Sequence, residues 1–313
     1  MKSTSQLLND YADKIISGKT LNRFESIRGA IELEARSTLN YRDSTAQVAT
    51  LSNGSASCGT DPSVHTNSDY PFTNEMRVKF DMQNIETALL VANEMNRYTE
   101  TDSSCGLHIH IKASSLVGFS LETTNGVRRL QRILTCLASA SKRYELAFYG
   151  LSGQRNRVNN STYSRPLELS TFEQLKSMNP SRLSNLAIGR RTSFLNLTNL
   201  SNYDYSPNER TIEFRGFSAS PSLNGENTPN VIRAKHVESA LFLILNLLST
   251  AMSETSDLNK LRTARKHPLA SKSFQWFLHH SCKRPLVKRW ENKDLVLQMI
   301  SYIMQNCQAC DAI

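Results

Sequence analysis

The chain has no uninterrupted apolar run that approaches the roughly 20 residues needed to cross a bilayer. Its first residues, Met1-Lys-Ser-Thr-Ser-Gln, lack the apolar stretch of a secretory signal. Six cysteines stand at scattered spacings among the 313 residues, and the sequence contains no internal repeat or low-complexity tract. These absences predict a cytoplasmic protein with reduced thiols and no membrane partner. At 39% hydrophobic residues, the chain can still bury a substantial core.

Acidic residues are missing from one long segment, residues 258–290. It holds nine Lys or Arg and no Asp or Glu, and since the whole chain has 37 basic against 28 acidic residues, this segment alone equals the net charge of +9. With Trp276, Phe277 and Trp290 interleaved, it could hold nucleic acid or another polyanion through phosphate contacts and stacking. The alternative, which we favour, is a solvated helical face whose aromatic residues pack on the core.

Apolar periodicity and turn residues predict an α+β fold. We expect a mainly antiparallel sheet with a polar concave active-site face, helices on the other face and a helical C-terminal extension. The predicted domains are a catalytic domain at 1–255 and a basic helical extension at 256–313. The predicted order of elements is helix 7–17, strand 28–37, polar loop 38–66, strand 74–80, helix 83–98, strand 105–112, helix 127–148, basic loop 150–165, strands 192–199 and 209–217, and helices from 231–252 to the end.

Three of the predicted strands carry chemically active residues two positions apart. His108 and His110 share one face of their strand, Glu32 and Glu34 share a face of another, and Glu213 and Arg215 share a face of a third. Each pair alone is also compatible with an ordinary solvated or structural strand face. If the strands pair in one sheet, however, carboxylates, imidazoles and a guanidinium converge, and all of these groups can hold a metal or a phosphate.

The order of these motifs resembles the amidoligase family of bacteria and phages. The elements that carry the resemblance are Glu32-Leu-Glu34, Asp61-Pro-Ser-Val64, Glu75, Cys105-Gly-Leu-His-Ile-His-Ile111, Arg155-Asn156 and Thr211-Ile-Glu-Phe-Arg-Gly-Phe217. The family is part of the carboxylate–amine ligase group, which shares its fold with glutamine synthetase and glutamate–cysteine ligase. The match runs from about Arg28 to Phe217. Pro62 departs from the pattern, because the family usually has Gly after this Asp.

The resemblance implies a ligase that uses ATP and Mg²⁺ to join a carboxylate to an amine through an acyl phosphate. Mg²⁺ prefers carboxylate oxygens, so the metal-ligand candidates are Glu32, Glu34, Glu75 and Glu213. His108 or His110 would complete the metal shell or bind a phosphate. Resemblance to glutamine synthetase places one of these histidines near the nucleotide-side metal. Arg215 would bind the transferring phosphoryl group in fork geometry.

Three further residues are candidates for the same reaction. Arg155 and one of the neighbouring pair Arg190 and Arg191, with Arg191 as the choice, could contact a phosphate or a substrate, although surface arginines are usually only solvated. Asp61 could position the amine or the carboxylate, although Asp-Pro-Ser is also an ordinary turn signal. Cys105 is predicted to be a small buried residue and not a nucleophile, since its side chain would lie on the strand face opposite His108.

Two functions therefore compete. The first is an ATP-dependent ligase whose carboxylate and amine substrates could sit on a macromolecule. The second is a nucleic-acid- or polyanion-binding protein on a ligase-like scaffold, which would use residues 258–290. The polar strand faces and the motif order favour the ligase, whereas the binding protein explains only the basic segment.

Overall fold

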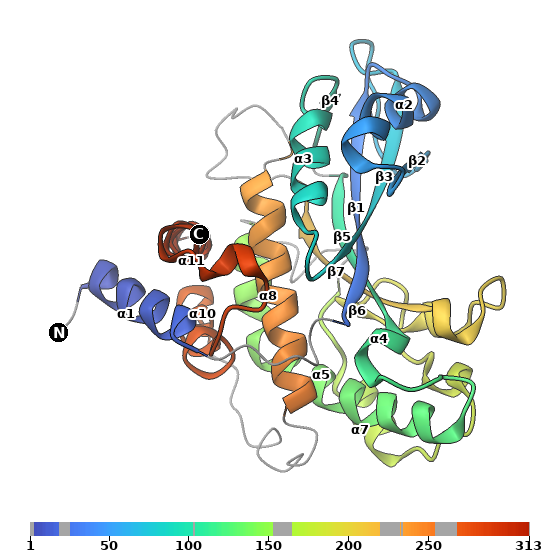
Figure 1. The fold of residues 1–313 in the computed structure, drawn as a ribbon, viewed down its shortest axis with the longest axis vertical. Helices are drawn as coiled ribbons and strands as arrows, with labels where there is room; N and C mark the ends of the chain where they lie inside the picture. Colours follow the sequence, from blue (N-terminus) through green and yellow to red (C-terminus); the bar gives the residue numbers. More distant parts are fainter. Residues whose placement is uncertain are drawn as a thin grey trace.

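The fold of this computed structural model centres on one mainly antiparallel sheet, as the sequence predicted (Figure 1). The structure describes residues 3–18, 26–102, 104–152, 165–219, 232, 234–253 and 268–312. The strand order is β2-β3-β1-β5-β7-β6, and β4 pairs with the end of β1. The strands are β1 (Arg28–Ser37), β2 (Ala56–Gly59), β3 (Phe72–Asp81), β4 (Thr99–Glu100), β5 (Gly106–Lys112), β6 (Leu195–Asn196) and β7 (Thr211–Ser218).

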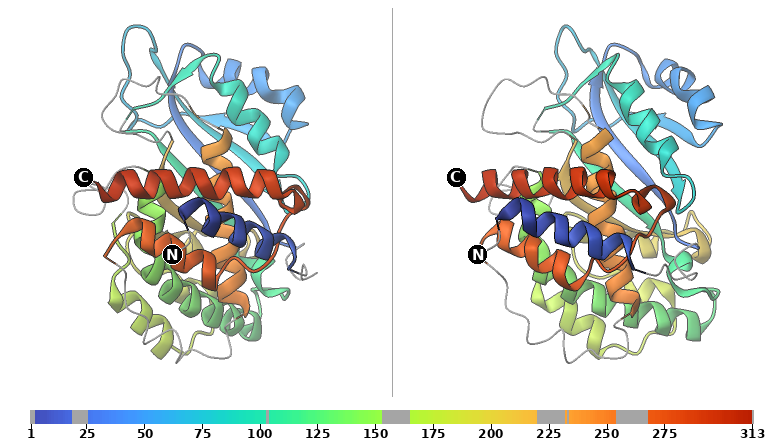
Figure 2. Two further views of the ribbon diagram at one scale, coloured as in Figure 1. Left: turned by 90° about the vertical axis from the view of Figure 1, so that its left-hand side faces the viewer. Right: turned by 60° about the vertical axis from the view of Figure 1, so that its left-hand side comes forward.

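Helices cover the apolar face of this sheet in two layers. The contacts place α3 and α5 against strands and α8 against α3 and α5, and the outer layer is formed by α1, α10 and α11 (Figure 2). The helices are α1 (Thr4–Ile16), α2 (Tyr41–Ser52), α3 (Glu86–Met95), α4 (Ala113–Val117), α5 (Thr124–Leu151), α7 (Leu169–Ser177), α8 (Ala234–Ser253), α10 (Ala270–His280) and α11 (Lys293–Asp311). The α+β class is thus confirmed.

Alternation along the central strands separates the core from the polar face. Ile31 and Leu33 on β1 and Leu107 and Ile109 on β5 are fully buried toward the core. In the register, Leu33 lies opposite Leu107 and Ile31 opposite Ile109, so the apolar residues of both strands form continuous rows. The residues between them therefore share the opposite face of the sheet.

Strand β7 departs from regular pairing where it passes His108. Leu107 pairs with Phe217 and Ile109 with Phe214, so two residues of β7 lie opposite one residue of β5. Because of this bulge, Phe214 and Phe217 point to the same face of the sheet although they are three residues apart. Both rings therefore contact the buried ring of Phe194. A Cβ on Gly216 would lie 2.2 Å from that ring. Glycine at this position therefore allows the close approach of strand and ring.

The predicted polar loop at 38–66 is wrong, because this segment contains α2 and β2. Asn40 caps α2 by accepting hydrogen bonds from the backbone of Arg42 and Asp43. The buried face of α2 consists of Ser44, Val48 and Ser52, which follow helical spacing with two serines in place of apolar residues. The helix therefore gives almost no hydrophobic periodicity in the sequence.

The other predicted elements differ from the structure mainly in length, whereas α4, α7 and β4 were not predicted. The region 192–199 contributes only the two residues of β6, after which the chain turns into a 3-10 helix at Thr198–Ser201. Helix α3 is shorter than predicted at both ends. Further 3-10 turns, none of them predicted, lie at Leu183–Leu186, Pro207–Glu209 and Lys288–Glu291.

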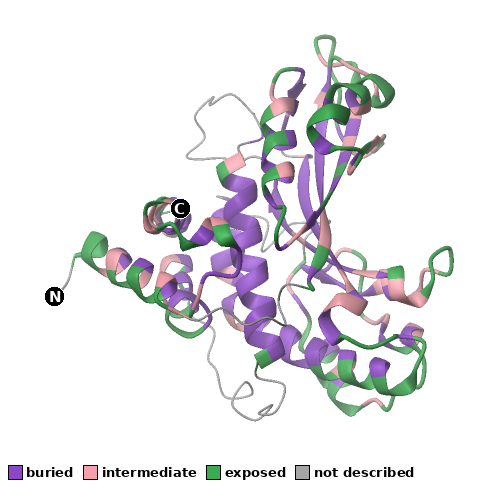
Figure 3. Cartoon of the chain, in the orientation of Figure 1, coloured by how far each residue is buried: buried purple, intermediate pink, exposed green. Residues whose placement is uncertain are grey.

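Helix α8 has the length and composition of a membrane-crossing helix, which the sequence analysis did not anticipate. Polar residues such as Ser239 and Asn246 interrupt its sequence, so it contains no unbroken apolar run of the roughly 20 residues that cross a bilayer. In the structure, 89% of the most hydrophobic part of α8 is buried inside the protein (Figure 3). It lies between α5, α3 and α11 as a core helix.

The C-terminal residues pack closely on the rest of the chain. Helix α10 contacts α5, and α11 contacts α5, α8 and α1. Within the described part of the basic segment, Phe277 and Trp290 are fully buried, whereas Trp276 is 42% exposed. The favoured interpretation, aromatic residues packing on the core, is thus confirmed for Phe277 and Trp290. Residues 254–267, with Arg262, Arg265 and Lys266, lie outside the described residues.

Candidate metal centre

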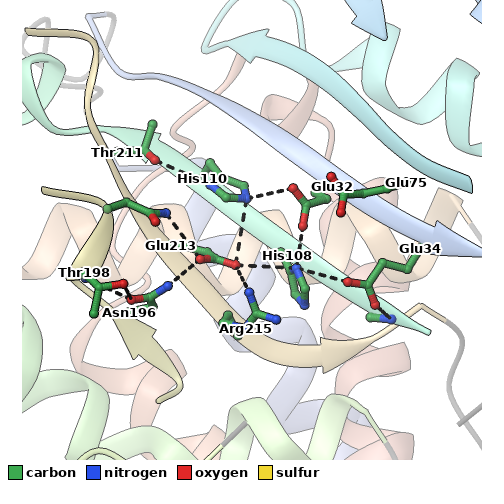
Figure 4. A network of polar contacts seen from close by, with 12 residues as sticks. Glu32, Glu34, Glu75, His108, His110, Asn196, Thr198, Thr211, Glu213 and Arg215 are labelled. Carbon is green, nitrogen blue, oxygen red and sulfur yellow. Dashed lines mark hydrogen bonds and ion pairs between the residues drawn. The ribbon is translucent and has the colours of Figure 1, made fainter. Parts of the chain in front are cut away.

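The sheet register brings the predicted glutamates and histidines together on the polar face (Figure 4). Glu32 on the central strand β1 lies between Arg77 on β3 and His108 on β5. Two residues further along β1, on the same face of the sheet, Glu34 lies opposite Glu75 of β3. On the other side of the site, His110 of β5 lies opposite Glu213 of β7. Four neighbouring strands thus contribute to one polar cluster.

His108 lies at the centre of this cluster. Its Nδ1 is 2.8 Å from Glu32 Oε1, 3.6 Å from Glu34 Oε1 and 3.5 Å from Glu213 Oε1. The four residues are each only 3–4% exposed. Buried charges require partners, and one imidazole among three carboxylates supplies only part of the positive charge. Burial opposes the imidazolium form, but the hydrogen bond to Glu32 and the charge of Glu34 raise the pKa of His108.

Glu32 is the most heavily paired carboxylate of the cluster. Its Oε2 lies 2.8 Å from Nε of Arg77 and 3.3 Å from Nε2 of His110. Burial alone would raise the pKa of this carboxyl group, but the hydrogen bond from His108 and the nearby imidazole of His110 lower it below the usual range. Glu32 is therefore held as a carboxylate with both oxygens directed at cationic or hydrogen-bonding groups.

Glu34 and Glu75 are the two carboxyl groups of the cluster whose pKa values are raised. Burial and the charge of Glu32 raise the pKa of Glu75 to about 7, against the opposing effect of Arg77. Burial also raises the pKa of Glu34, although His108 and a 2.6 Å hydrogen bond from the backbone N–H of Gly106 lower it. A Cβ on Gly106 would lie 2.7 Å from His108 Nε2 and 2.9 Å from Glu34 Oε2, so a side chain at this position would displace both groups. Without a further cation, these carboxylates repel one another.

Glu213 is oriented by amides on one oxygen and by a guanidinium on the other. Its Oε2 accepts hydrogen bonds from Asn196 Nδ2 at 2.6 Å and Asn199 Nδ2 at 3.4 Å. Its Oε1 accepts from Arg215 Nη1 at 2.5 Å and faces both histidines. Nε of Arg215 is buried and has no hydrogen-bond partner among the described residues. This donor is suited to an anionic ligand.

Two overlapping sets of side chains could each hold a metal ion. Glu32, His108 and Glu213 form one set, and Glu32, Glu34 and Glu75 form the other, with the ligand atoms of each set within 4.8 Å of one another. Carboxylate oxygens with an imidazole nitrogen suit Mg²⁺ or Mn²⁺. Burial and the charges of neighbouring carboxylates raise the pKa of Glu75, and a divalent cation would neutralise the negative charge gathered there. The residues therefore fit such an ion.

The remaining predicted site residues have different outcomes. Asp61 lies close enough to raise the pKa of both Glu34 and Glu75, and its Oδ1 accepts a hydrogen bond from Ser63 N, so it lies beside the cluster. Arg191 is exposed, and none of the cluster contacts in the described part of the chain involves it. Arg155 lies outside the described residues.

Three residues whose side chains contact the cluster were not predicted from the sequence: Arg77, Asn196 and Asn199. Arg77 stands two positions after Glu75, so the alternation of that strand could have revealed it. Asn196 stands in a two-residue strand with no periodicity, and only the fold places it beside Glu213. Cys105 was correctly predicted as buried, and burial raises the pKa of its thiol to about 12. Such a thiol is not a ready nucleophile.

Compared with known proteins, the chain matches no family model and no curated protein. The family resemblance therefore rests on the motifs themselves.

Proposed function

We propose that the protein is an ATP- and Mg²⁺-dependent carboxylate–amine ligase. The observation that carries the proposal is the buried cluster of Glu32, Glu34, Glu75 and Glu213 around His108, with an arginine on each side. A solvated strand face would not bury three carboxylates, Glu32, Glu34 and Glu213, and partly bury a fourth, Glu75. The resemblance to amidoligases supplies the reaction class, and the cluster supplies the groups that this reaction needs.

The proposed reaction has two steps. A carboxylate oxygen of the substrate forms a bond to the γ-phosphorus of ATP while the bond to the β–γ bridging oxygen breaks, and ADP leaves. The amine nitrogen then attacks the carbonyl carbon, expels inorganic phosphate and loses a proton. Bound Mg²⁺ would neutralise the phosphate charge and orient the transferring group.

Each residue of the cluster has a distinct part in this proposal. The four glutamates are the metal ligands, and His108 and His110 hold Glu32 ionised. Arg215 donates its free N–H groups to the transferring phosphoryl oxygens. Asp61, beside Glu34 and Glu75, positions the amine by its negative charge.

Replacing Glu213 by Gln tests the proposal. We expect the variant to fold normally but to lose about tenfold or more in Mg-ATP affinity, since a neutral amide binds Mg²⁺ more weakly than a carboxylate and Mg²⁺ is the group that offsets the phosphate charge. Nucleotide binding is measured by calorimetry, and ADP release is followed with mixtures of amines and carboxylic acids. Glu209→Gln is the control, because Glu209 is an exposed glutamate that pairs with Lys112 outside the cluster.

Arg215→Lys separates binding from turnover. An ammonium keeps the charge but not the fork of donors, so nucleotide binding should persist while ADP release slows. Unchanged nucleotide binding and ligation in Glu213→Gln would contradict the metal-ligand role that we assign to this residue.

A further inference from the structure

The two oxygens of Glu213 face different surroundings. Asn196 is fully buried on β6, and its Nδ2 donates to Glu213 Oε2 at 2.6 Å (Figure 4). Asn199 Nδ2 donates to the same oxygen at 3.4 Å. The other oxygen, Oε1, faces His108 at 3.5 Å and His110 at 3.9 Å. Glu213 therefore turns one oxygen toward the other candidate ligands and keeps the second oxygen on amide donors.

The turn after β6 fixes which end of the Asn196 amide faces Glu213. The backbone N–H of Thr198 donates to Asn196 Oδ1 at 2.9 Å, and the Thr198 hydroxyl donates to the same oxygen at 2.7 Å. A backbone N–H can only donate, so the amide atom beside it must be the oxygen. The amino group of Asn196 is then the end that faces Glu213. A hydrogen-bond donor is thus held on Glu213 Oε2.

The other two buried carboxylates of the cluster are restricted in a similar way. Glu34 Oε2 accepts a hydrogen bond from the backbone N–H of Gly106 at 2.6 Å. Glu32 Oε1 lies 2.8 Å from His108 Nδ1, and its Oε2 accepts from Arg77 Nε at 2.8 Å. Like Glu213, neither group can turn both of its oxygens to a cation without losing a short hydrogen bond. The cluster is therefore built to offer single carboxylate oxygens.

Ligation through single carboxylate oxygens distinguishes Mg²⁺ from Ca²⁺. Ca²⁺ takes roughly six to eight oxygen ligands, and carboxylates often bind it through both oxygens. Mg²⁺ is smaller, requires a near-ideal octahedral arrangement, keeps several waters and needs only a few carboxylate oxygens. Mn²⁺ also suits octahedral oxygen sites. A cluster whose carboxylates cannot chelate therefore favours Mg²⁺ and Mn²⁺ over Ca²⁺.

We propose that Asn196 determines the metal specificity of the centre, because it restricts Glu213 to ligation through Oε1 and so selects against Ca²⁺. This inference rests on the metal-ligand role of Glu213 in the proposed function. Asn196 is a positioning residue and not a ligand, since it acts on the cation only through Glu213. Thr198 belongs to the same arrangement, because it orients the amide of Asn196. The centre would then retain Mg²⁺ where both cations are present.

The test measures the binding of cations in the absence of nucleotide. Mg²⁺, Mn²⁺ and Ca²⁺ are titrated separately by calorimetry, and the thermal stabilisation by each cation is measured in parallel. The variants are Asn196→Ala, which removes the amide, and Asn196→Asp, which keeps an oxygen for Thr198 but removes the donor to Glu213. Asn246→Ala is the matched control, since Asn246 is a buried asparagine of α8 whose Nδ2 donates to the carbonyl of Phe242 and not to a carboxylate.

We expect the unaltered protein to bind Mg²⁺ and Mn²⁺ more tightly than Ca²⁺. In Asn196→Ala, the ratio of Ca²⁺ affinity to Mg²⁺ affinity should rise about tenfold, since the loss of a charge-assisted hydrogen bond frees Oε2 of Glu213 for chelation. Asn196→Asp should shift the ratio in the same direction. Because this variant preserves the turn after β6, it decides the question even if Asn196→Ala folds poorly. Asn246→Ala should lower the thermal unfolding midpoint without changing the ratio.

Three outcomes would overturn this role of Asn196. The first is an unaltered protein that binds Ca²⁺ as tightly as Mg²⁺. The second is an unchanged affinity ratio in both Asn196 variants, which would make Asn196 only a structural partner of Glu213. The third is an equal shift of the ratio in Asn246→Ala. If the protein selects Mg²⁺ through Asn196 but binds no nucleotide, the ligase proposal fails and the specificity role stands. If it ligates with Mg-ATP while the ratio is unchanged in the variants, only the specificity role fails.

Discussion

Glu75 is the carboxylate of the cluster whose charge changes near neutral pH. Its pKa is raised from 4.5 to about 7, so the folded protein holds a proton there that the unfolded chain has already lost. The stability gained from this proton is complete below the unfolded value and is lost as the pH rises through the folded value. The raised pKa values of Glu34 and His108 act with the same sign. The lowered pKa of Glu32 acts only at more acidic pH.

We therefore predict that the metal-free protein becomes less stable as the pH rises from about 5 to about 7. Thermal unfolding in a chelating buffer across this range should show the midpoint falling by several degrees, and Glu75→Gln should flatten the dependence. Saturating Mg²⁺ should also flatten it, because the cation binds the ionised carboxylates. A midpoint that rises with pH in the chelating buffer would contradict this arrangement of charges.

At the residue scale, alternation alone predicted most of the cluster. Glu32, Glu34, His108 and Glu213 lie together because each alternates along its strand with apolar residues that face the core. Alternation could not predict Asn196, because a two-residue strand has no period. It also could not predict which carboxylates are paired and which are uncompensated, since that depends on the register between strands distant in sequence.

Among the elements, β7 has the least regular geometry and the most direct influence on the site. Its bulge directs Glu213 and Arg215 to the polar face while both Phe214 and Phe217 reach the core. The ring of Phe194 fills the space beside Gly216 and stacks on Phe148 with centroids 5.1 Å apart, so it cannot move away easily. The bulge thus depends on the absence of a side chain at Gly216.

We predict that Gly216→Ala lowers the free energy of unfolding by about 1–3 kcal/mol, the usual cost of overpacking a core. Urea unfolding measures the change. Gly59→Ala on β2 is the matched control, since a Cβ there meets no atom within 4 Å, and it should change stability by no more than about 0.5 kcal/mol. Equal effects of the two substitutions would show that the bulge relaxes around a methyl group.

Helix α2 was not predicted because its buried face is mostly polar, whereas the short helices α4 and α7 were missed although they bury apolar residues such as Leu116 and Leu175. In α2 the serines at 44 and 52 occupy inward positions, and Asn74 of β3 hydrogen-bonds to Ser44 there. Long, strongly periodic elements such as α5 were predicted within three residues at each end. Hydrophobic pattern is a reliable signal only where burial is apolar.

For the whole molecule, the basic segment is the main feature that the ligase proposal does not use. Phe277 and Trp290 are buried, and Arg289 is bound to Glu238 at 2.7 Å, so these residues are committed to the core and its surface. Lys272, Lys283 and Lys288 are exposed. Recognition of a polyanion by this segment would therefore rest on phosphate contacts and not on stacking of these two rings.

We predict that any association with nucleic acid is independent of sequence and weakens steeply with salt. Neutral replacements at Arg262, Arg265, Lys266, Lys283 and Lys288 should abolish it while Mg-ATP affinity is unchanged. Titrations of labelled single- and double-stranded nucleic acid at several salt concentrations measure both properties. Binding that resists salt, or that survives the replacements, would point to a different surface.

The pairing of β5 with β7 also governs when the site comes into existence. Thr211 approaches His110 across this pairing, although the two residues are 101 positions apart in the chain. Contacts between residues so far apart in the chain form slowly, because closing the long loop between them costs conformational entropy before the contact can stabilise the fold. During synthesis, β5 therefore has an open edge until residues 211–218 emerge from the ribosome. Capacity to bind a metal at the full cluster is consequently a property of the completed fold, and it can serve as a probe of the last stage of folding.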